Sequence, residues 1–531
     1  MLGSLTVVTI AEESPAMHDL NWLCHTLRVL RKSLVFCGRN EGLATKIGPW
    51  VGGFVAKLQI PAKNALLPLV ALLGALLGGP WVAAADSPPN IVLILADDLG
   101  AAELGCYGQK KIRTPRIDQL ATEGLRFTQF YSGNAVCAPA RCGLMTGRHM
   151  GHAIVRDNRE QKPEGQFPLP AETVTIAELL KARGYATAAI GKWGLGPPGS
   201  EGDPNKQGFD LFYGCNCQRH AHNHYPTYVW KNDQRVELEG NTNGVTGKQF
   251  THDLMEAEAL NFIRAHRQQP FFLYVPFLVP HVAIQVPEDS LAEYQGKLDD
   301  APYDGKQGYK PHPAPHAGYA AMVTRLDRSV GRIVDLLAEL KLDENTLVLF
   351  TSDNGPTHGR VGGADSEFFE SAGGLRGLKG SLYEGGIRVP LIARQPGKIK
   401  PGVNATPGVF YDFLPTLCEV AGADARSAKS DGVSLAPVLF GGQTPQREFL
   451  YWEFPGYGGQ QAVRMGNWKG VRQQLGKGKT AIELYDLQAD PAEQTNLAEK
   501  RPEVVAKIAA IMQREHTPSL DFPLQTIDQA K

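Results

Sequence analysis

Two pairs of polar side chains each follow a strongly apolar segment of the chain. Asp97-Asp98 comes just after the run 90–95, NIVLIL, and Asp353-Asn354 comes just after the run 346–351, TLVLFT. Short continuous apolar runs are typical of buried strands. In open α/β sheets, ligand-bearing residues lie just past the carboxyl ends of the strands. Either pair alone could instead cap a helix, but both stand where such a sheet carries its site.

A cysteine at the start of an expected helix is another candidate for chemistry. Cys137 precedes Pro139 by two residues, and proline favours the first turn of a helix. The side chain at position 137 is therefore expected at a helix N-terminus. The partial positive charge of that end favours a bound anion.

The segments that must position these residues alternate between short apolar runs and amphipathic runs from residue 90 onward. This pattern predicts an α/β fold, with a large, mostly parallel sheet sandwiched by helices. Strands are expected at 90–95, 125–131, 185–190, 271–277, 346–351 and 386–393. Helices are expected at 116–123, 175–182, 252–267, 317–340 and 411–420. The stretches 196–226 and 284–316 are expected to be long loops that act as lids or pocket walls.

Beyond about residue 440 the alternation fades. Short strand-like runs and a final helix follow, at 447–454, 462–464, 468–472, 482–486 and 502–514. This predicts a smaller C-terminal α+β domain with an antiparallel sheet. The expected boundaries are 86–435 for a catalytic domain and 436–531 for the C-terminal domain.

The composition excludes some classes of protein. Among 531 residues, Lys plus Arg number 54 and Asp plus Glu 55, for a net charge of −1. Nucleic-acid binding is not expected, because such domains carry a clustered basic excess. Eight cysteines are too few for a disulfide scaffold of this length.

The segment 1–85 is expected to be a leader. The run 65–79 is strongly apolar, Lys57 and Lys63 precede it, and Ala83-Ala84-Ala85 supplies a small-residue cleavage site. This predicts a secretory signal peptide cleaved near Ala85, and hence an exported, periplasmic or secreted protein with no membrane span after cleavage. An uncleaved anchor or a buried helix is the alternative. The long stretch before the apolar run suggests that the true start lies near Val51 or Val55.

The cysteine lies in a longer motif. Cys137-Ala138-Pro139-Ala140-Arg141, followed by Thr146-Gly147, resembles the C-x-P-x-R signature of the type I sulfatase family, the formylglycine-dependent arylsulfatases and carbohydrate sulfatases of the alkaline-phosphatase-like superfamily. Further segments resemble family motifs in the family's order: Asp97-Asp98, 184–193, Pro280-His281, Asp353-Asn354, 375–390 and 484–491.

The resemblance implies two cofactors. Cys137 would be oxidised to formylglycine by a formylglycine-generating maturation enzyme. Asp97, Asp98, Asp353 and Asn354, together with position 137, would hold a divalent cation. Oxygen ligands favour Ca²⁺ or Mg²⁺ over zinc, and four protein ligands favour Ca²⁺.

The resemblance also implies roles for the basic residues. Three cations, Arg141, Lys192 and Lys379, balance the three carboxylates, so a divalent metal leaves a net positive pocket suited to a sulfate monoester. These cations would hold the sulfuryl oxygens. A hydroxyl of the hydrated aldehyde would attack sulfur, and His281 would protonate the leaving alkoxide as general acid. The second hydroxyl would then be deprotonated, which expels sulfate.

The expected function is hydrolysis of sulfate monoesters, and the His-, Tyr- and Trp-rich loop 215–230 favours carbohydrate sulfates. Small aryl sulfates remain an alternative. So does a phosphodiesterase or phosphonate hydrolase of the same superfamily, or a non-catalytic sugar-binding relative.

One position departs from the family. The family often reads G-K-W-H-L-G, with its histidine near the aldehyde, whereas this chain has Gly194 there. Substitutes for the missing base are His149, His152 and the cluster His220, His222 and His224, for which zinc binding is a weaker interpretation. We expect His149, His220 and His222 to contact substrate, and His220 or His222 to supply the base.

Overall fold

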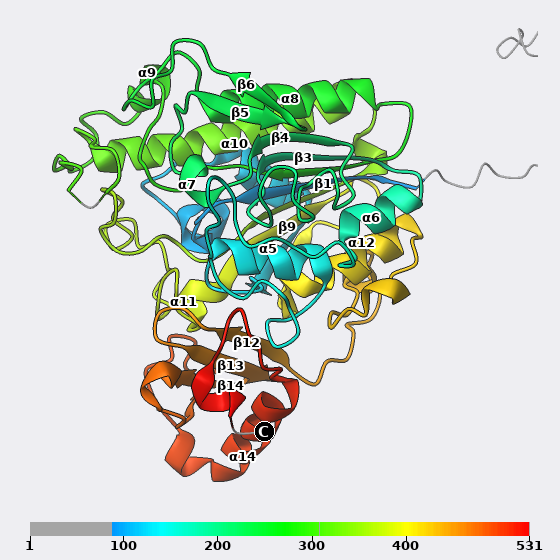
Figure 1. Cartoon of the computed structure of the whole chain (residues 1–531), viewed down its shortest axis with the longest axis vertical. Helices are drawn as coiled ribbons and strands as arrows, with labels where there is room; N and C mark the ends of the chain where they lie inside the picture. The colour runs from blue at the N-terminus through cyan, green and yellow to red at the C-terminus, as the bar shows by residue number, and fades with distance from the viewer. Residues whose placement is uncertain (1–87, 307, 530–531) are drawn as a thin grey trace, which may run out of the picture. The chain divides into compact units, whose positions relative to one another are not determined.

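The computed structural model describes residues 88–306 and 308–529 (Figure 1). The expected leader, 1–85, lies outside these residues. Within them, no helix combines the length and the apolar character that crossing a membrane requires.

The central sheet is built around β1 (Asn90–Ala96), which pairs in parallel with β7 (Phe271–Pro276) and with β8 (Thr346–Ser352). On one side, β3 (Ala186–Lys192) and β4 (Leu211–Cys215) continue the parallel order beyond β7. This central part confirms the mostly parallel sheet expected from the sequence.

The flanks of the sheet are mixed. β9 (Arg388–Arg394) runs antiparallel both to β8 and to β2 (Leu125–Tyr131). The outer strands are β5 (Tyr228–Lys231), β6 (Gln234–Glu237), β10 (Gly402–Asn404) and β11 (Gly408–Val409). The sequence analysis missed these four short strands and also β4, which lies inside a stretch expected to be loop. Strands this short carry little hydrophobic periodicity of their own.

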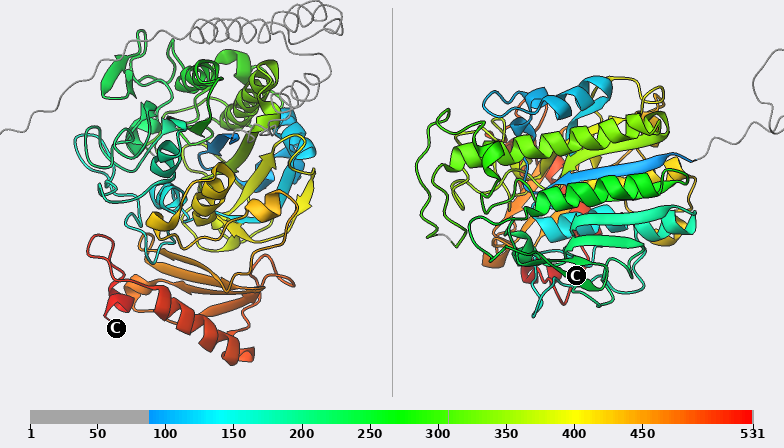
Figure 2. Two further views of the ribbon diagram at one scale, coloured as in Figure 1. Left: turned by 90° about the vertical axis from the view of Figure 1, so that its right-hand side faces the viewer. Right: turned by 90° about the horizontal axis from the view of Figure 1, so that it is seen from above.

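Two layers of helices cover the sheet, as Figures 1 and 2 show. Along β1, Val92 and Ile94 pack into one core with α4, α8 and α10, and Ile91 and Leu93 pack into the other with α5, α6 and α12. Both faces of the strand are therefore buried, which explains its uninterrupted apolar sequence. The helices span α4 (Pro115–Glu123), α5 (Cys137–Thr146), α6 (Ile176–Ala182), α8 (Thr251–Ala265), α10 (Pro315–Glu339) and α12 (Phe413–Ala421).

A second, antiparallel sheet follows in the C-terminal part, with α14 (Pro502–Glu515) packed against it (Figure 2). Its strands, in order, are β12 (Leu450–Phe454), β13 (Gln460–Met465), β14 (Trp468–Gln473) and β15 (Glu483–Asp486). The α+β character expected for this region is confirmed.

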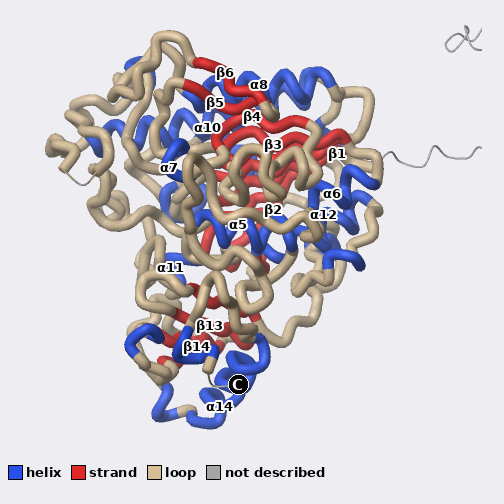
Figure 3. The backbone as a smooth tube through the Cα atoms, in the orientation of Figure 1, coloured by secondary structure: helices blue, strands red, loops and turns tan. Residues whose placement is uncertain are grey.

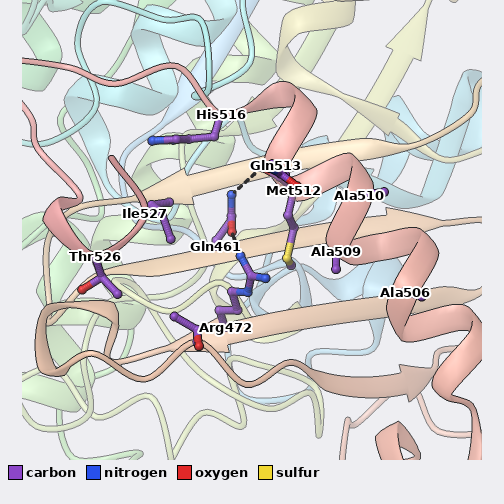
Figure 4. A pocket seen from close by; sticks show the side chains of 11 residues that line it. Gln461, Arg472, Ala506, Ala509, Ala510, Met512, Gln513, His516, Thr526 and Ile527 are labelled. Atoms are coloured by element: carbon purple, nitrogen blue, oxygen red, sulfur yellow. Dashed lines mark hydrogen bonds between the residues drawn. The ribbon is translucent and has the colours of Figure 1, made fainter. Parts of the chain in front are cut away.

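A cavity of about 590 Å³ lies in the C-terminal part, beside α14 and α15 (Gln525–Asp528) (Figure 4). Arg472 donates to Gln461 Oε1 over 2.9 Å, and Gln461 donates to the carbonyl of Met512 over 3.0 Å. None of the residues that line this cavity was singled out by the sequence analysis.

A buried charge cluster joins the two sheets. Lys469 Nζ on β14 lies 2.9 Å from Glu384 Oε1 in α11 (Glu384–Ile387) and 3.0 Å from Glu493 Oε1, and all three side chains are fully buried. Tyr131 at the end of β2 donates to Glu384 over 2.7 Å. Nearby, Trp452 Nε1 donates to the carbonyl of Ser132 over 2.8 Å. Polar contacts therefore fix the C-terminal sheet to the chain segment that leads into α5.

Replacing Lys469 with methionine should destabilise the protein strongly. The change leaves two carboxylates buried without their cation, and breaking a buried ion pair from one side typically costs about 3–5 kcal/mol. Chemical denaturation would measure the free energy of unfolding. The matched control is Lys479→Met, at an exposed lysine of the same domain, where a change within about 0.5 kcal/mol is expected. Equal effects of the two substitutions would contradict this role for Lys469.

Candidate active site

The carboxyl ends of four parallel strands meet at one edge of the central sheet. Asp97-Asp98 follows β1, Lys192 is the last residue of β3, His281 lies in the turn after β7, and Asp353-Asn354 follows β8. Because these strands are parallel neighbours, residues far apart in the sequence come together, as expected for a sheet of this kind.

Helix α5 brings the cysteine to this edge. Cys137 is the first residue of the helix and is buried. Its Sγ lies 3.5 Å from Asp97 Oδ1, 4.0 Å from Asp98 Oδ1 and 3.5 Å from Lys379 Nζ. Arg141 stands four residues further on, on the same face of the helix. The helix N-terminus predicted at position 137 is confirmed.

Three ion pairs connect the cluster. Lys192 Nζ lies 2.6 Å from Asp97 Oδ2, and Lys379 Nζ lies 2.7 Å from Asp98 Oδ2. In the third pair, Arg141 Nη2 lies 2.8 Å from Asp353 Oδ2. Each carboxylate thus has its own cation, so the six side chains are together neutral and a bound divalent metal would make the site net positive.

The turn after β1 is locked onto β8. The Asp98 N–H donates to Asp353 Oδ1 over 3.0 Å, and the Leu99 N–H donates to Ser352 Oγ over 2.9 Å. Asp98 itself has a φ of +68°, a left-handed conformation that costs a residue other than glycine about 1–3 kcal/mol. The surrounding hydrogen bonds hold this conformation, which aims the Asp98 carboxylate into the cluster.

The donor atoms of the cluster fit a hard cation. One ligand atom each from Asp97, Asp98, Cys137 and His281 lies within 4.8 Å of the others. Asn354 donates through Nδ2 to Asp98 Oδ1 over 2.8 Å, which leaves its buried Oδ1 without a partner among the described residues. An unpaired amide oxygen beside three carboxylates is an environment that Ca²⁺ or Mg²⁺ would satisfy.

His281 is held as a neutral ring. Its Nδ1 donates to the Val282 carbonyl, and its Nε2 accepts from Lys379 Nζ over 3.2 Å. Burial, followed by the charges of Lys379 and Lys192, lowers the pKa of His281 well below its usual value. In this arrangement Nε2 carries no proton, so the general-acid role expected for His281 requires a proton delivered to that atom.

The unmodified cysteine is a poor nucleophile here. Burial raises the pKa of the Cys137 thiol to about 12, although Lys192 and Lys379 oppose the shift. The side chain is therefore a neutral thiol near pH 7, and thiols react through the thiolate.

The histidines expected to contact substrate lie in three different settings. His222 follows the short helix α7 (Gln218–Ala221), and its ring stacks on that of His281 with 4.2 Å between centroids. The structure thus brings His222 to the cluster. Burial, followed by the charge of His281, lowers the pKa of His222 well below its usual value.

His220 is placed differently. Its Nδ1 lies 3.1 Å from Glu164 Oε1, and its Nε2 lies 2.9 Å from the Tyr228 carbonyl. Both ring nitrogens face acceptors, so the ring is an imidazolium without a free lone pair. Burial lowers the pKa of His220, but Cys215 and the Glu164 carboxylate raise it by more, and the net shift is upward. A ring held in this way cannot take up a proton, which argues against His220 as the substitute base.

His149 is buried against the C-terminal part of the chain. It stacks on His152 at 4.2 Å, and its Nε2 lies 3.3 Å from Glu515 Oε2. None of the described contacts joins it to the residues around Cys137. Its Nδ1 accepts from the Gly151 N–H over 3.1 Å, whereas a metal-bound histidine normally donates from its second nitrogen. The cluster of His149, His152 and Asp431 is therefore a poor metal site, and substrate contact by His149 stays a prediction.

Sequence reasoning missed two buried polar residues. Gln218, the first residue of α7, has no partner among the described residues for either amide atom, and the Tyr274 hydroxyl is likewise unpartnered. Burial raises the pKa of Tyr274, and the charge of Arg141 opposes that shift. The one feature of the sequence that pointed indirectly to Gln218 was Gly194, because a glycine in place of the family's histidine leaves space for another side chain.

Comparison with known proteins agrees with this geometry. The family model described as Sulfatase matches residues 89–423, and the model described as N-sulphoglucosamine sulphohydrolase, C-terminal, matches residues 378–517. Human arylsulfatase A is 36% identical over 80% of this chain and 86% of its own length. The N-acetylgalactosamine-6-O-sulfatase of Bacteroides thetaiotaomicron is 30% identical over 81% of this chain and 93% of its own.

Among solved structures, Ps i-CgsB in complex with k-i-k-neocarrahexaose superposes with a TM-score of 0.69 and 27% identity. The match covers 83% of this chain and 94% of that one. The large α/β core and the C-terminal antiparallel sheet are thus shared with proteins of known structure.

Replacing His220 with glutamine should destabilise the protein by about 1–3 kcal/mol, the usual range for a hydrogen bond to a charged group. Because the pKa of His220 is raised, its contribution is complete below the unfolded value of about 6.5, shrinks steadily as the pH rises above that value, and is gone once the pH has passed the folded value. The difference in unfolding free energy between wild type and variant should therefore be largest at about pH 5 and clearly smaller at about pH 9.

The control for this measurement is Arg219→Gln, which breaks an ion pair to Glu160 from a side chain that is 73% exposed. Such pairs contribute about 0–1 kcal/mol. A difference between wild type and His220→Gln that is the same at about pH 5 and about pH 9 would mean that folding does not raise the pKa of the ring, contrary to the assignment.

Proposed function

Because the chain belongs to the sulfatase family and is a sulfuric ester hydrolase, we propose that it removes sulfate from sulfated carbohydrates at the cluster around Cys137. The observation that carries the proposal is the buried set of three cations, Arg141, Lys192 and Lys379, gathered beside the first residue of α5. With a divalent cation bound, the site would carry a net positive charge, which suits a sulfate monoester anion.

The carbohydrate assignment has two supports. The similar proteins include an N-acetylgalactosamine-6-O-sulfatase and a protein solved with a neocarrahexaose. Strand β5, which follows the loop after α7 (Figure 3), also carries the partly exposed Tyr228 and Trp230, whose rings could stack on a sugar. The identity of the sugar and the position of the sulfate lie beyond these two supports.

Two cofactors complete the site in this proposal. Cys137 is converted to formylglycine by a maturation enzyme, and Asp97, Asp98, Asp353 and Asn354 hold the cation, for which their oxygen donors favour Ca²⁺ over Mg²⁺. Together these groups supply the nucleophile for sulfur when both are in place.

The remaining work falls to the side chains of this chain. Arg141, Lys192 and Lys379 hold the sulfuryl oxygens and stabilise the charge that develops on them. His281 Nε2 accepts from Lys379 Nζ, so Lys379 is the group that would deliver the proton that His281 passes to the oxygen of the leaving alcohol. His222, stacked on His281, is the remaining candidate for the base.

Two further parts of the proposal concern the whole chain. The catalytic domain spans 86–435 and the C-terminal domain 436–531. The protein is exported, as the apolar run and cleavage site near Ala85 suggest. Export fits a substrate class met outside the cytoplasm.

Mass spectrometry tests the modification directly. Protein made together with a maturation enzyme should give a tryptic peptide about 18 Da lighter at position 137, since a thiol becomes an aldehyde. Cys137→Ala should abolish turnover, and Cys142→Ala, at a second buried cysteine of the same helix, should leave the 18 Da loss in place. Full activity of a preparation whose Cys137 is wholly unmodified would exclude this mechanism.

Metal analysis tests the ligands. Asp97→Ala and Asp353→Ala should each lose the bound cation together with activity, because the two carboxylates come from different strands and meet at one site. Chelation should lower the melting temperature of wild type, and added Ca²⁺ should restore it, since a ligand bound only by the folded state stabilises that state. Asp431→Ala, in the His149 cluster, is the control and should keep stoichiometric metal. Loss of the cation from that variant alone would place the site elsewhere.

A further inference from the structure

Gln218 occupies the space that a side chain at position 194 would fill. Gly194 has a φ of +80°, and a Cβ built on it would lie 2.7 Å from Gln218 Nε2. Among the described residues, leaving aside Gly194 and its two chain neighbours, no atom outside the Gln218 side chain lies within 4 Å of that Cβ position. The glutamine amide therefore stands where the Cα–Cβ bond of residue 194 would point.

The amide is buried and unpaired. Gln218 is 6% exposed, and neither Nε2 nor Oε1 has a hydrogen-bond partner among the described residues. Buried polar groups of native proteins are nearly always paired, and exceptions call for an explanation. A glutamine that only filled space would be better replaced by an apolar side chain, since an unpaired buried amide is destabilising.

The backbone ties this amide to the catalytic edge of the sheet. Lys192 on β3 is paired in register with Cys215 on β4, and beyond them the Gly194 N–H donates to the Asn216 carbonyl over 3.2 Å. Gln218 follows two residues after Asn216. One end of α7 is thus fixed beside the segment that carries Lys192.

The other end of α7 reaches the same cluster. The residue after the helix is His222, whose ring stacks on His281, and His281 accepts from Lys379, the neighbour of Cys137. Helix α7 therefore runs from the Lys192 side of the site, where Gln218 lies, to the His281 side, where His222 lies.

We propose that Gln218 is a substrate-binding residue of the sulfatase site, with Nε2 donating a hydrogen bond to a sulfuryl oxygen. The inference rests on the proposed function and adds a residue that replaces the histidine often found at position 194 in the family. An amide donates and accepts hydrogen bonds but exchanges no proton near neutral pH. A glutamine amide in place of the histidine therefore keeps a hydrogen-bond donor to the sulfate group but removes an acid–base group from this position. Proton transfer is then left to the imidazoles of His222 and His281.

The test is Gln218→Met, which keeps the length of the side chain and removes its hydrogen-bonding atoms. We expect kcat/KM for a sulfate ester to fall about 10- to 100-fold, the equivalent of one hydrogen bond to a charged group. The melting temperature should stay the same or rise, because an unpaired buried amide is lost. The pH profile of kcat/KM should keep its shape, because no titrating group is removed. The kcat/KM of Gln218→Glu should fall further than that of Gln218→Met, since a carboxylate repels the sulfate group.

The matched control is Gln395→Met. Gln395 is also buried with an unpartnered Oε1, but it follows β9, which runs antiparallel to β8, so it lies at the opposite edge of the sheet. Its kcat/KM should stay at the wild-type value.

Wild-type activity separates the two proposals. A mature, metal-loaded wild type that cleaves neither sulfated sugars nor 4-nitrophenyl sulfate would contradict the proposed function. An active wild type with an equally active, folded Gln218→Met would refute the role of Gln218 alone. A variant that is slower only because it is less stable, or whose pH profile changes shape, would also overturn the inference. Should Gln218→Met fail to fold, the kinetic test would be made with Gln218→Leu. The affinity for inorganic sulfate would also be compared between wild type and Gln218→Glu. Equal sulfate affinities would refute the role of Gln218.

Discussion

The constraint on which this structure depends is the burial of three carboxylates and three cations at one edge of the central sheet. An isolated buried charge is very costly, and the cost is offset only when charges are paired with good geometry. Here Asp97, Asp98 and Asp353 each have a cation of their own. These partners come from β3, from α5 and from the segment before α11, so the electrostatic requirement can be met only when these elements have assembled.

This requirement explains several local features. Asp98 adopts a left-handed conformation because its N–H and its carboxylate are both held, by Asp353 and by Lys379. Helix α5 is buried along its whole length, which places Cys137 and Arg141 against the sheet edge without exposure to bulk water. The C-terminal sheet contributes indirectly, since Lys469 pairs with Glu384 of α11 and Trp452 donates to the carbonyl of Ser132, which precedes α5.

The region after β3 contains the one position, Gly194, at which the sequence was found to differ from the family motif. Gly194 has no side chain, and the amide of Gln218 lies in the corresponding space. The same short helix then presents His222 to His281, whereas His220 turns away to Glu164. Within this segment the Gln218 amide exchanges no proton, the His222 ring faces His281, and His220 lies outside the cluster.

By itself the sequence determined the long central strands, the main helices and the identity of the charged residues. Continuous apolar runs marked β1, β7 and β8 because strands buried on both faces have no polar alternation, and the residues that follow them could be placed at a common edge because parallel strands end together. The cysteine motif placed position 137 at a helix start. Short strands such as β4 to β6 escaped notice because they contain too few residues for a periodic signal.

Only the tertiary structure decided which cation pairs with which carboxylate, because those contacts join residues separated by 95 to 281 positions. The tertiary structure also decided which groups His220 and His222 contact, although their spacing in the sequence made the two histidines look equivalent. His222 and His220 lie two residues apart on a tight turn, so their rings point to different neighbours. Gln218 became visible as a site residue only through the space left by a glycine distant from it in the chain, since what a buried amide can do depends on which atoms surround it.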